Sequence, residues 1–471
     1  MSLISTRDAT GEQYSYTDAL LQGLAPDGGL YVPDAYPTVS TEELIALKGA
    51  PYGAIVKLIK EKLVGDTIDS GTLERLIAAA YTNEKFPEVE NEQYTPVRRV
   101  KDNLYIQNLS LGPTAAFKDM AMQQLGQEMN YELNRRDEEL VILGATSGDT
   151  GSAAEAALKG LERVKLFMLS PEEGMSPFQK GQMGSLSGDN IFNISIQGRF
   201  DDCQDLVKAI KQEAEFAHLG AVNSINWGRI SSQIPYYFSG YLQTAAQVGD
   251  LVDFVVPSGN FGNVLAGYYA KQMGLPIRHL IVATNENDVL HTLFETGVYT
   301  LSPTQVTSSP SMDISKASNY ERLAFDVLGR DPEALASYMK IFNETGTVDI
   351  KQYGADHSAF STLGFKSGHS HHALRLETIT SLYEATGQAV DPHTADGVAV
   401  ARQHYDVSEE IPMVCMETAL PVKFEATLTE ALGATLERPE RFVGMEEYAT
   451  GEKFMLLPIS QSQLESYIRS H

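Results

Sequence analysis

The chain of 471 residues contains only two cysteines, Cys203 and Cys415, and a single tryptophan, Trp227. Two cysteines are too few for the disulfide framework of a secreted protein, so a reducing, cytoplasmic setting is expected. No stretch approaches the roughly 18 consecutive apolar residues that a membrane-spanning helix requires. The first residues are polar and lack a basic segment followed by an apolar run, which predicts that there is no signal peptide.

Basic side chains are also scarce. The chain has 36 lysine and arginine residues against 62 aspartate and glutamate residues, a formal net charge of −26. This balance argues against nucleic acid and anionic membranes as partners, because both require a basic face. The electrostatic field of such an acidic chain would not attract an anionic substrate. Binding one would require a local cluster of hydrogen-bond donors. The length predicts two or three domains, and the 43% apolar content suffices for a large core.

Apolar runs alternate with amphipathic stretches through most of the chain. Buried strands are expected at 140–145, 164–169, 253–257, 279–283 and 411–417, and helices at 150–159 and 263–273. This alternation predicts an α/β fold with parallel sheets covered on both faces. The first 95 residues differ, with helices expected around 40–47 and 71–80 and a turn-rich stretch at 25–33.

Four units are predicted from this organisation. They are an N-terminal domain (1–95), an α/β domain that includes a smaller mobile part (96–240), a large α/β domain (241–440) and a C-terminal tail (441–471).

The first chemically informative segment is Gly-Pro-Thr-Ala-Ala-Phe-Lys-Asp at 112–119. Its Gly-Pro turn delivers Lys118 to the start of an expected helix. The positive potential at a helix N-terminus disfavours the charged ammonium and helps to leave Lys118 a neutral nucleophile, as imine chemistry requires. Taken alone, the spacing fits an ordinary surface lysine at a helix start at least as well.

Two further segments lie between an expected strand and an expected helix: Ala-Thr-Ser-Gly-Asp-Thr-Gly at 145–151 and Pro-Ser-Gly-Asn-Phe-Gly-Asn at 257–263. Their glycines allow tight turns in which backbone amides converge, and such turns bind carboxylates or phosphates. The second is neither a Rossmann fingerprint nor a P-loop. Purely structural loops are the alternative for both, with Asp149 or Thr150 acting as a helix cap in the first.

The fourth segment, Glu-Thr-Ala-Leu-Pro-Val-Lys-Phe at 417–424, follows the last expected strand. Thr418 could donate a hydrogen bond to an aromatic ring nitrogen, and Lys423 is a rival to Lys118 that lacks the Gly-Pro turn. Ligands bind at the carboxyl ends of strands in open parallel sheets. The segments at 145–151, 257–263 and 417–424 can therefore surround one cofactor.

With these segments in this order, the sequence resembles the threonine synthase family. These are fold type II enzymes that depend on pyridoxal 5'-phosphate (PLP) and are related to the tryptophan synthase β subunit. The resemblance covers nearly the whole chain, with further matching segments at 5–7, 23–33, 200–204, 223–229, 283–288, 309–313 and 391–395. The variants at 110–114 and 391–397 are most similar to actinobacterial enzymes.

The resemblance implies a role for each segment. Lys118 would hold PLP as a Schiff base, and Thr418 would face its pyridine nitrogen. The cofactor phosphate would be held by Gly259, Asn260, Phe261, Gly262 and Asn263. The substrate would be O-phospho-L-homoserine, converted with water to L-threonine and phosphate. Its amino-acid part would be bound by Thr146, Ser147, Gly148, Asp149 and Thr150, and its phosphate by Asn226 and Arg229.

Two positions depart from the family pattern. Many members have histidine where this chain has Leu111 and Leu420, so a local donor is expected to be missing or supplied elsewhere. The family form with this N-terminal extension tends to be monomeric, which is implied for this chain too.

Four other interpretations apply to the sequence or to parts of it. A threonine dehydratase or related lyase on the same scaffold is the alternative enzyme, and a non-catalytic ligand-binding protein is the alternative outside catalysis. The histidines at 368–372 are not expected to form a metal site, because no cysteine or carboxylate lies nearby at ligand spacing. Ser147 is not expected to be a hydrolase nucleophile, because its segment is not a Gly-x-Ser-x-Gly elbow.

Overall fold

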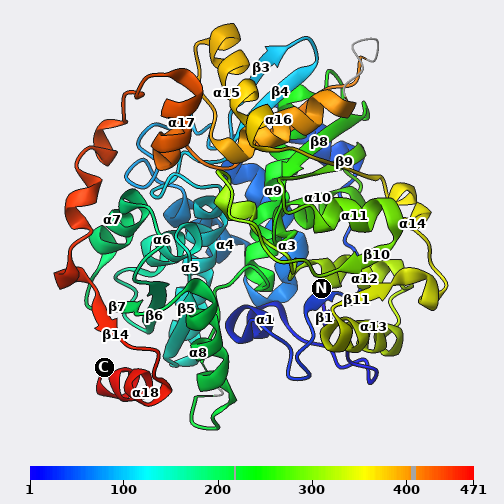
Figure 1. Cartoon of the computed structure of the whole chain (residues 1–471). Coiled ribbons are helices and arrows are strands. Elements are labelled where there is room, and N and C mark those ends of the chain that lie inside the picture. Colours follow the sequence, from blue (N-terminus) through cyan, green and yellow to red (C-terminus); the bar gives the residue numbers. More distant parts are fainter. Residues whose placement is uncertain (217–218, 405–409) are drawn as a thin grey trace.

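A computed structural model describes residues 1–216, 219–404 and 410–471 (Figure 1). The chain builds two main sheets, a six-stranded sheet of order β12-β9-β8-β13-β4-β3 and a four-stranded sheet of order β14-β7-β6-β5. Every neighbouring pair in both sheets is parallel except β3 and β4. The predicted α/β class with two parallel sheets is confirmed.

The six-stranded sheet is covered on both faces. Its strands are β3 (Val97–Lys101), β4 (Leu104–Asn108), β8 (Val252–Pro257), β9 (Ile277–Thr284), β12 (Phe365–His369) and β13 (Met413–Glu417). Alternate residues of β8 enter different cores, because successive side chains of a strand point to opposite faces. Phe254 packs in the core that contains Tyr237 of α9 (Trp227–Thr244) and Leu265 of α10 (Gly262–Gln272), whereas Val255 packs with Val398 of α16 (Pro392–His404).

The four-stranded sheet is covered in the same way. It consists of β5 (Leu140–Ala145), β6 (Val164–Pro171), β7 (Ile191–Ile196) and β14 (Met455–Leu457). Helices α5 (Lys118–Arg136), α6 (Asp149–Leu158) and α7 (Pro177–Leu186) contribute to the core on one face, and α8 (Phe200–Gln212) and α18 (Gln461–Ser470) to the core on the other. The C-terminal segment returns from the large sheet to the small one, where β14 forms the edge (Figure 1).

The N-terminal part combines a small hairpin-like sheet with four helices. Its elements are β1 (Leu3–Ser5), α1 (Tyr16–Gln22), β2 (Tyr31–Pro33), α2 (Thr41–Ala46), α3 (Tyr52–Val64) and α4 (Ser70–Ala80). The helices expected around 40–47 and 71–80 are confirmed as α2 and α4. Helix α2 begins with a capping box, in which Ser40 and Glu43 satisfy each other's backbone N–H groups. Helix α3 was not expected.

The remaining elements surround the large sheet. They are α11 (Val289–Thr296), β10 (Val298–Thr300), α12 (Tyr320–Val327), α13 (Pro332–Thr345), β11 (Thr347–Asp349), α14 (Ser358–Thr362), α15 (His372–Thr386) and α17 (Glu425–Leu432). Within the described ranges, no helix is both long and apolar enough to cross a membrane.

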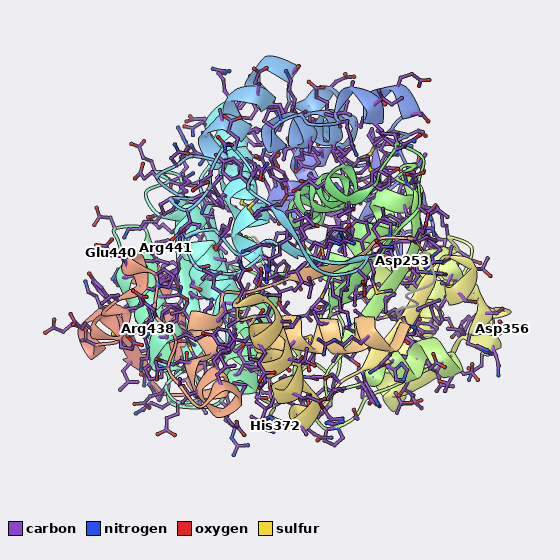
Figure 2. All side chains as sticks on the ribbon, turned by 90° about the horizontal axis from the view of Figure 1, so that it is seen from above. Asp253, Asp356, His372, Arg438, Glu440 and Arg441 are labelled. Carbon is purple, nitrogen blue, oxygen red and sulfur yellow. The ribbon has the colours of Figure 1, made fainter. Side chains whose placement is uncertain are left out.

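Sheet membership departs from the predicted division of the chain at two places. Strands β3 and β4 lie within the predicted 96–240 unit but pair in the large sheet beside β13. Strand β14 lies in the predicted tail but completes the small sheet beside β7. The C-terminal segment between the two sheets is charged, and Figure 2 shows Arg438, Glu440 and Arg441 together on one side of the molecule.

A buried ion pair docks the N-terminal helices on the rest of the molecule. The Lys60 Nζ of α3 lies 2.8 Å from a carboxylate oxygen of Glu128 in α5, and both side chains are fully buried. Lys60 also donates to the Ser231 hydroxyl of α9 at 3.2 Å, and the Tyr16 hydroxyl donates to Glu128. Burial lowers the pKa of Lys60 from its ordinary value, and Glu128 opposes that shift. The pair therefore ties α1 and α3 to α5 and α9.

Breaking this pair from one side is expected to be costly. Replacing Lys60 by methionine should lower the free energy of unfolding by about 3–5 kcal/mol, because it leaves the Glu128 carboxyl buried without its cation. Urea denaturation followed by circular dichroism measures the loss. The double variant Lys60→Met, Glu128→Leu should recover most of it, and a single-variant loss below about 1 kcal/mol would show that the pair does not hold the helices.

Candidate active site

Lys118 is the first residue of α5 and the centre of the candidate site. The preceding turn has no room for a side chain at Gly112, where a Cβ would approach the Cβ of Asp119 to 2.3 Å. The buried Asp119 closes the turn by accepting bonds from the Thr114 backbone N–H at 2.9 Å and the Thr114 hydroxyl at 2.6 Å. The prediction that a Gly-Pro turn delivers Lys118 to a helix start is confirmed.

The surroundings of Lys118 favour its neutral amine. Its side chain is 15% exposed, and its Nζ lies 3.7 Å from Oδ2 of Asp149. Burial lowers the pKa of Lys118 to about 8, Asp149 opposes this, and the cations of Arg229 and Lys423 reinforce it. About a tenth of Lys118 is therefore an uncharged nucleophile at pH 7, far more than for an ordinary lysine.

Asp149, the first residue of α6, contacts several polar side chains around Lys118. Its Oδ1 accepts hydrogen bonds from Lys423 Nζ at 2.7 Å and Gln179 Nε2 at 3.0 Å. Its Oδ2 accepts a bond from the Ser311 hydroxyl at 3.0 Å and faces Lys118. Burial alone would raise the pKa of Asp149, but Lys423 and Lys118 lower it well below its ordinary range. The carboxylate is thus a fixed negative charge between two lysines.

The two candidate lysines differ in how their amines are engaged. The fully buried Lys423 donates to Asp149 and to the Thr114 carbonyl oxygen at 2.9 Å. Lys118 lies farther from Asp149, at 3.7 Å, and is partly accessible. Bond formation with an aldehyde requires an accessible, unengaged amine, so the geometry favours Lys118 over Lys423.

The 145–151 turn contains Asp149, and its shape is held largely by hydrogen bonds to Thr146. The Thr146 hydroxyl oxygen accepts from the backbone N–H groups of Gly148 at 3.0 Å and Gly151 at 2.9 Å. Gly148 has φ +145°, and a Cβ there would lie 2.6 Å from the Gln179 side chain. Ser147 is exposed and Thr150 is half-buried. Substrate binding by these five residues stays a prediction.

The 257–263 turn opens α10. Phe261 has φ +65° at the cap, in the left-handed region that non-glycine residues rarely adopt. Its ring packs against Phe294, Tyr320 and Phe365, so only the backbone of Phe261 can serve a ligand. At Gly259 a Cβ would lie 3.1 Å from the Ser311 carbonyl oxygen, so this position requires glycine.

The two asparagines of the turn are held differently. The Asn260 side-chain oxygen accepts from the Ser318 hydroxyl at 3.0 Å. The Asn263 side-chain oxygen accepts from the Tyr237 hydroxyl at 3.0 Å, while its Nδ2 is buried without a partner. A buried amide donor is costly to leave unpaired, which marks Asn263 as a donor to an absent acceptor.

Helix α9 brings Lys118 and the 257–263 turn together. The Tyr236 hydroxyl donates to the carbonyl oxygen of Phe117, next to Lys118, at 3.2 Å. The adjacent Tyr237 hydroxyl donates to the Asn263 carbonyl oxygen at 2.8 Å. Ser311 forms a second link. Its hydroxyl donates to Asp149, and its carbonyl oxygen lies next to Gly259, 3.1 Å from where a Cβ would be.

Thr418 follows β13 and lies next to the same centre. Its carbonyl oxygen accepts from the Phe117 N–H at 2.9 Å, and its own N–H donates to the Thr394 hydroxyl oxygen at 3.2 Å. The segments at 112–119, 145–151 and 417–424 therefore meet around Lys118, as expected for loops at the carboxyl ends of parallel strands. The 257–263 turn is linked to them through α9 and Ser311.

Asn226 and Arg229, the two residues considered for substrate phosphate, differ in available donors. The Asn226 amide donates to the carbonyl oxygens of Leu20 and Ala221 at 2.9 and 3.1 Å, and its oxygen caps α9. Arg229 donates to the Val222 carbonyl oxygen at 3.2 Å, but its Nε is buried without a partner. Only Arg229 retains a spare buried donor.

The structure also places residues that sequence reasoning left without a role. Ser311 and Gln179 bind Asp149, and Ser311 belongs to the 309–313 segment quoted for the resemblance. Arg441 donates to the carbonyl oxygens of Gly112 at 2.9 Å and Leu111 at 3.4 Å. A cation from the C-terminal segment thus binds the backbone of the turn that precedes Lys118.

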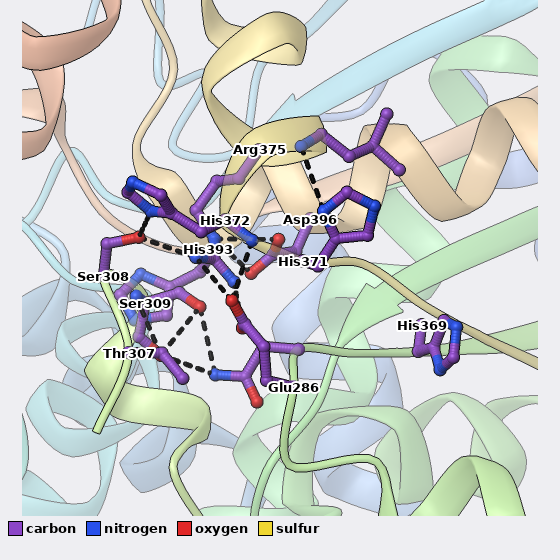
Figure 3. Close-up of polar contacts among 12 residues, drawn as sticks. Glu286, Thr307, Ser308, Ser309, His369, His371, His372, Arg375, His393 and Asp396 are labelled. Carbon is purple, nitrogen blue, oxygen red and sulfur yellow. Dashed lines mark hydrogen bonds and ion pairs between the residues drawn. The ribbon is translucent and has the colours of Figure 1, made fainter. Parts of the chain in front are cut away.

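The histidines at 369–372 act as local contacts (Figure 3). His369 Nδ1 lies 3.3 Å from an Asp288 carboxylate oxygen, and His372 Nδ1 lies 2.9 Å from the Ser308 hydroxyl. His371 accepts from the Leu374 N–H at the start of α15. Among the described residues, no group of three or more histidine, cysteine or carboxylate side chains is arranged to hold a metal ion.

Comparison with known proteins identifies the family. Three family models match: the threonine synthase N terminus at 2–81, the pyridoxal-phosphate dependent enzyme family at 89–353, and the C-terminal threonine synthase domain at 394–468. Threonine synthase from Methylobacillus glycogenes is 46% identical over 481 residues, covering 100% of both chains. The enzyme from Corynebacterium glutamicum is 48% identical over 455 residues, covering 94% of each.

The chain belongs to the threonine synthase family. A solved structure of PLP-bound threonine synthase from Brucella melitensis aligns with a TM-score of 0.93 at 39% identity, covering 100% of this chain and 99% of that one. Membership of the threonine synthase family makes the chain a PLP-dependent lyase of fold type II that acts in threonine biosynthesis. The comparisons favour this activity over that of a dehydratase.

Proposed function

We propose that the chain converts O-phospho-L-homoserine and water to L-threonine and phosphate, with Lys118 as the lysine that binds PLP covalently. The supporting observation is the position of the Lys118 amine, which lies 3.7 Å from the Asp149 carboxylate with a pKa lowered to about 8. Such an amine is a competent nucleophile toward an aldehyde and, once free, a competent base near neutral pH.

The residues around Lys118 fit PLP. The amides at 259–263 open the eleven-residue helix α10, whose N-terminus favours an anion such as the cofactor phosphate. The unpartnered Asn263 Nδ2 supplies a donor that such an anion would satisfy. Thr418 would place a hydroxyl, rather than a carboxylate, at the pyridine nitrogen. PLP supplies an electron sink for negative charge that develops on substrate carbons.

Lys118 would then move protons on the substrate. Displaced by the substrate's amine, its neutral Nζ can accept the proton from Cα. Loss of a second proton, from Cβ, would then allow phosphate to leave Cγ, and Cγ takes up a proton in its place. Addition of a hydroxyl from water at Cβ and return of a proton to Cα complete the balance to threonine and phosphate. The buried position of Asp149 and Lys423 around this amine limits access of bulk water, which would otherwise divert the reaction to hydrolysis.

Substrate recognition is proposed on both sides of Lys118. The 146–150 turn, with exposed Ser147 and half-buried Thr150, would bind the amino-acid end. Arg229, whose buried Nε has no partner and whose charge acts on Lys118, would receive the phosphate. The role earlier implied for Asn226 is better described as positioning α9, because its donors and acceptor are used in the cap.

Product identity tests this function. Purified enzyme with O-phospho-L-homoserine should release phosphate and threonine in equal amounts, measured by a coupled phosphate assay and amino-acid chromatography. A dehydratase would instead make 2-oxobutyrate and ammonia from threonine, and a phospho-lyase would release phosphate with a keto acid. Phosphate release without threonine would refute the proposal.

The Lys118 pKa predicts how cofactor binding depends on pH. Only the neutral amine attacks the aldehyde, and a lysine is neutral above its pKa. The rate at which PLP rebinds to enzyme stripped of cofactor should rise about tenfold per pH unit below pH 8 and level off above it. Stopped-flow absorbance measures this rate; a midpoint near 10.5, the ordinary lysine value, would contradict the assignment.

The setting of the enzyme is proposed from composition. Two buried cysteines and the −26 formal charge are compatible with a cytoplasmic protein that does not bind nucleic acid. We propose that the enzyme is a monomer. We also propose the units 1–95, 96–240, 241–440 and 441–471 as domains, with β3 and β4 pairing in the large sheet and β14 in the small sheet.

A further inference from the structure

The segment Asp-Pro-His-Thr at 391–394 opens α16 and is fully buried under the candidate site. Asp391 Oδ1 lies 2.7 Å from His393 Nδ1 and also accepts from the His393 N–H at 3.0 Å. Asp391 Oδ2 accepts from the Thr394 hydroxyl. A carboxylate beside Nδ1 keeps the hydrogen on that nitrogen, so the opposite nitrogen, Nε2, is an acceptor.

One branch of contacts runs from His393 to Lys118. His393 Nε2 accepts from the Ser311 backbone N–H at 3.0 Å. The Ser311 hydroxyl donates to Oδ2 of Asp149 at 3.0 Å, and that oxygen lies 3.7 Å from Lys118 Nζ. The position of the Asp149 oxygen that faces Lys118 therefore depends on where His393 holds Ser311.

A second branch runs from Thr394 to Thr418. The Thr394 hydroxyl gives its hydrogen to Asp391, so its oxygen can accept from the Thr418 N–H, at 3.2 Å. The Thr418 carbonyl oxygen in turn accepts from the Phe117 N–H at 2.9 Å. The backbone of Thr418 is thus fixed between Thr394 and the residue that precedes Lys118.

The Ser311 segment is held by several contacts, of which the bond to His393 is the one made by the Ser311 N–H. On either side of Ser311, the Asn285 amide donates to the Ser309 carbonyl oxygen at 3.2 Å and to the Asp313 carboxylate at 2.8 Å. Upstream, the fully buried Arg375 donates to the Ser308 hydroxyl at 2.6 Å and pairs with Glu286 and Asp396 (Figure 3). Those contacts help to fix 307–309, whereas the N–H of Ser311 is bound by His393. The Phe424 ring packs edge-on against the His393 ring, with centroids 4.8 Å apart, which shields the imidazole from solvent.

We propose that Asp391, His393 and Thr394 form a positioning group for the reaction, which aligns Asp149 and Thr418 on two sides of Lys118. Asp391 sets the tautomer of His393 and the direction of the Thr394 hydroxyl at once. None of the three contacts Lys118, so they act through Ser311, Asp149 and Thr418. This inference rests on the proposed roles of Lys118 and Thr418.

The His393 branch is tested by two substitutions that preserve different nitrogens. His393→Asn keeps a group near Nδ1 and loses the acceptor for the Ser311 N–H, whereas His393→Gln can place its amide oxygen where Nε2 lies. His393→Asn is expected to lower kcat by about 30-fold or more, and His393→Gln by less than about 5-fold. His369→Asn is the matched control, because His369 is 54% exposed and outside the positioning group, and it should leave kcat unchanged.

The Thr394 branch is tested in the same way. Thr394→Ser keeps the hydroxyl and should retain most activity, whereas Thr394→Val removes the acceptor for the Thr418 N–H and should lower kcat by about 10-fold or more. The two Thr394 variants test the proposal even if the His393→Asn variant does not fold. Equal losses in the serine and valine variants would overturn this branch.

A spectroscopic readout separates positioning from folding. Ser311 competes with Lys118 for Oδ2 of Asp149, so losing the His393 anchor should strengthen the carboxylate's effect on the Lys118 nitrogen. The pH midpoint of the visible absorbance of the bound cofactor should therefore rise by about 0.5 unit or more in His393→Asn, but not in His393→Gln or His369→Asn. A lower melting temperature with an unchanged midpoint and kcat within about 2-fold would overturn the inference.

Failure of the inference is distinguishable from failure of the proposed function. If the unsubstituted enzyme lacks a visible cofactor band reducible by borohydride, the assignment of Lys118 fails. If that band and threonine formation are present and all four substitutions at 393 and 394 leave kcat and the absorbance midpoint unchanged, only the positioning group is refuted.

Discussion

Replacing Lys118 by alanine is expected to lower kcat by about 10⁴-fold or more and to remove the visible absorbance of bound PLP. In the proposed mechanism Lys118 supplies both the bond to the cofactor and the base for the substrate proton, so its loss would remove two functions. The variant should still fold, because the side chain is partly exposed and its ion contact with Asp149 is long, at 3.7 Å.

Lys423→Met is the comparison for that result. Lys423 is bound to Asp149 and the Thr114 carbonyl oxygen and is not expected to bind the cofactor covalently. This variant should keep the visible band even where turnover falls. A band that survives in Lys118→Ala and disappears in Lys423→Met would reverse the assignment of the two lysines.

Replacing Asp149 by asparagine is expected to have the second-largest effect. The change leaves Lys423 buried without its carboxylate, which should lower the free energy of unfolding by about 3–5 kcal/mol at pH 7. The negative charge of Asp149 also raises the pKa of Lys118, so this pKa should fall below 8 in the variant. Because the aligned carboxylate at Lys118 is lost, kcat should fall by about 100-fold or more.

The pH dependence of stability provides the control for Asp149. Its pKa is lowered in the folded state, so its contribution is fully present above the ordinary aspartate value and is lost as pH falls below it. The difference in unfolding free energy between wild type and Asp149→Asn should be largest near pH 5. It should shrink below about pH 4, where Asp149 takes up a proton on unfolding, and also toward pH 8, because Lys118 loses its proton first in the variant. A difference that instead grows below about pH 4 would contradict the ion-pair role.

The fold was predictable where local patterns were unambiguous. Strand β5 is a run of apolar residues after a charged stretch, and α6 follows it within four residues, which is the signature of a parallel unit. Helix α3, which begins at Tyr52, was missed because its N-cap residue Pro51 offers no side-chain cap and the Gly-Ala-Pro stretch at 49–51 is typical of a loop. The exchange of β14 into the small sheet depends on contacts between distant segments, which no local pattern encodes.

The candidate site was predictable to the level of segments. Turns after parallel strands lie at the same edge of a sheet, so the position of the 145–151 turn beside Lys118 followed from its placement. The 257–263 turn is linked to this region through α9 and Ser311. The partners of Asp149 did not follow, because Ser311 and Gln179 come from loops and helices whose paths depend on the whole fold.

The directions in which side chains point could likewise not be predicted from the spacing of residues in the sequence. Phe261 lies in the turn expected to hold phosphate, yet its positive φ turns the ring into the core and leaves only its backbone for a ligand. The contact of Arg441 with the turn before Lys118 was not predicted either, because Arg441 lies some 330 residues away in sequence; its guanidinium donates to the carbonyl oxygens of Gly112 and Leu111.

The most direct test of the central claim is to locate the cofactor bond. Borohydride reduction of the purified enzyme, followed by proteolysis and peptide mass analysis, should place the reduced pyridoxyl group on the peptide that contains Lys118. A label on Lys423, or on no lysine while threonine is still formed, would contradict the account.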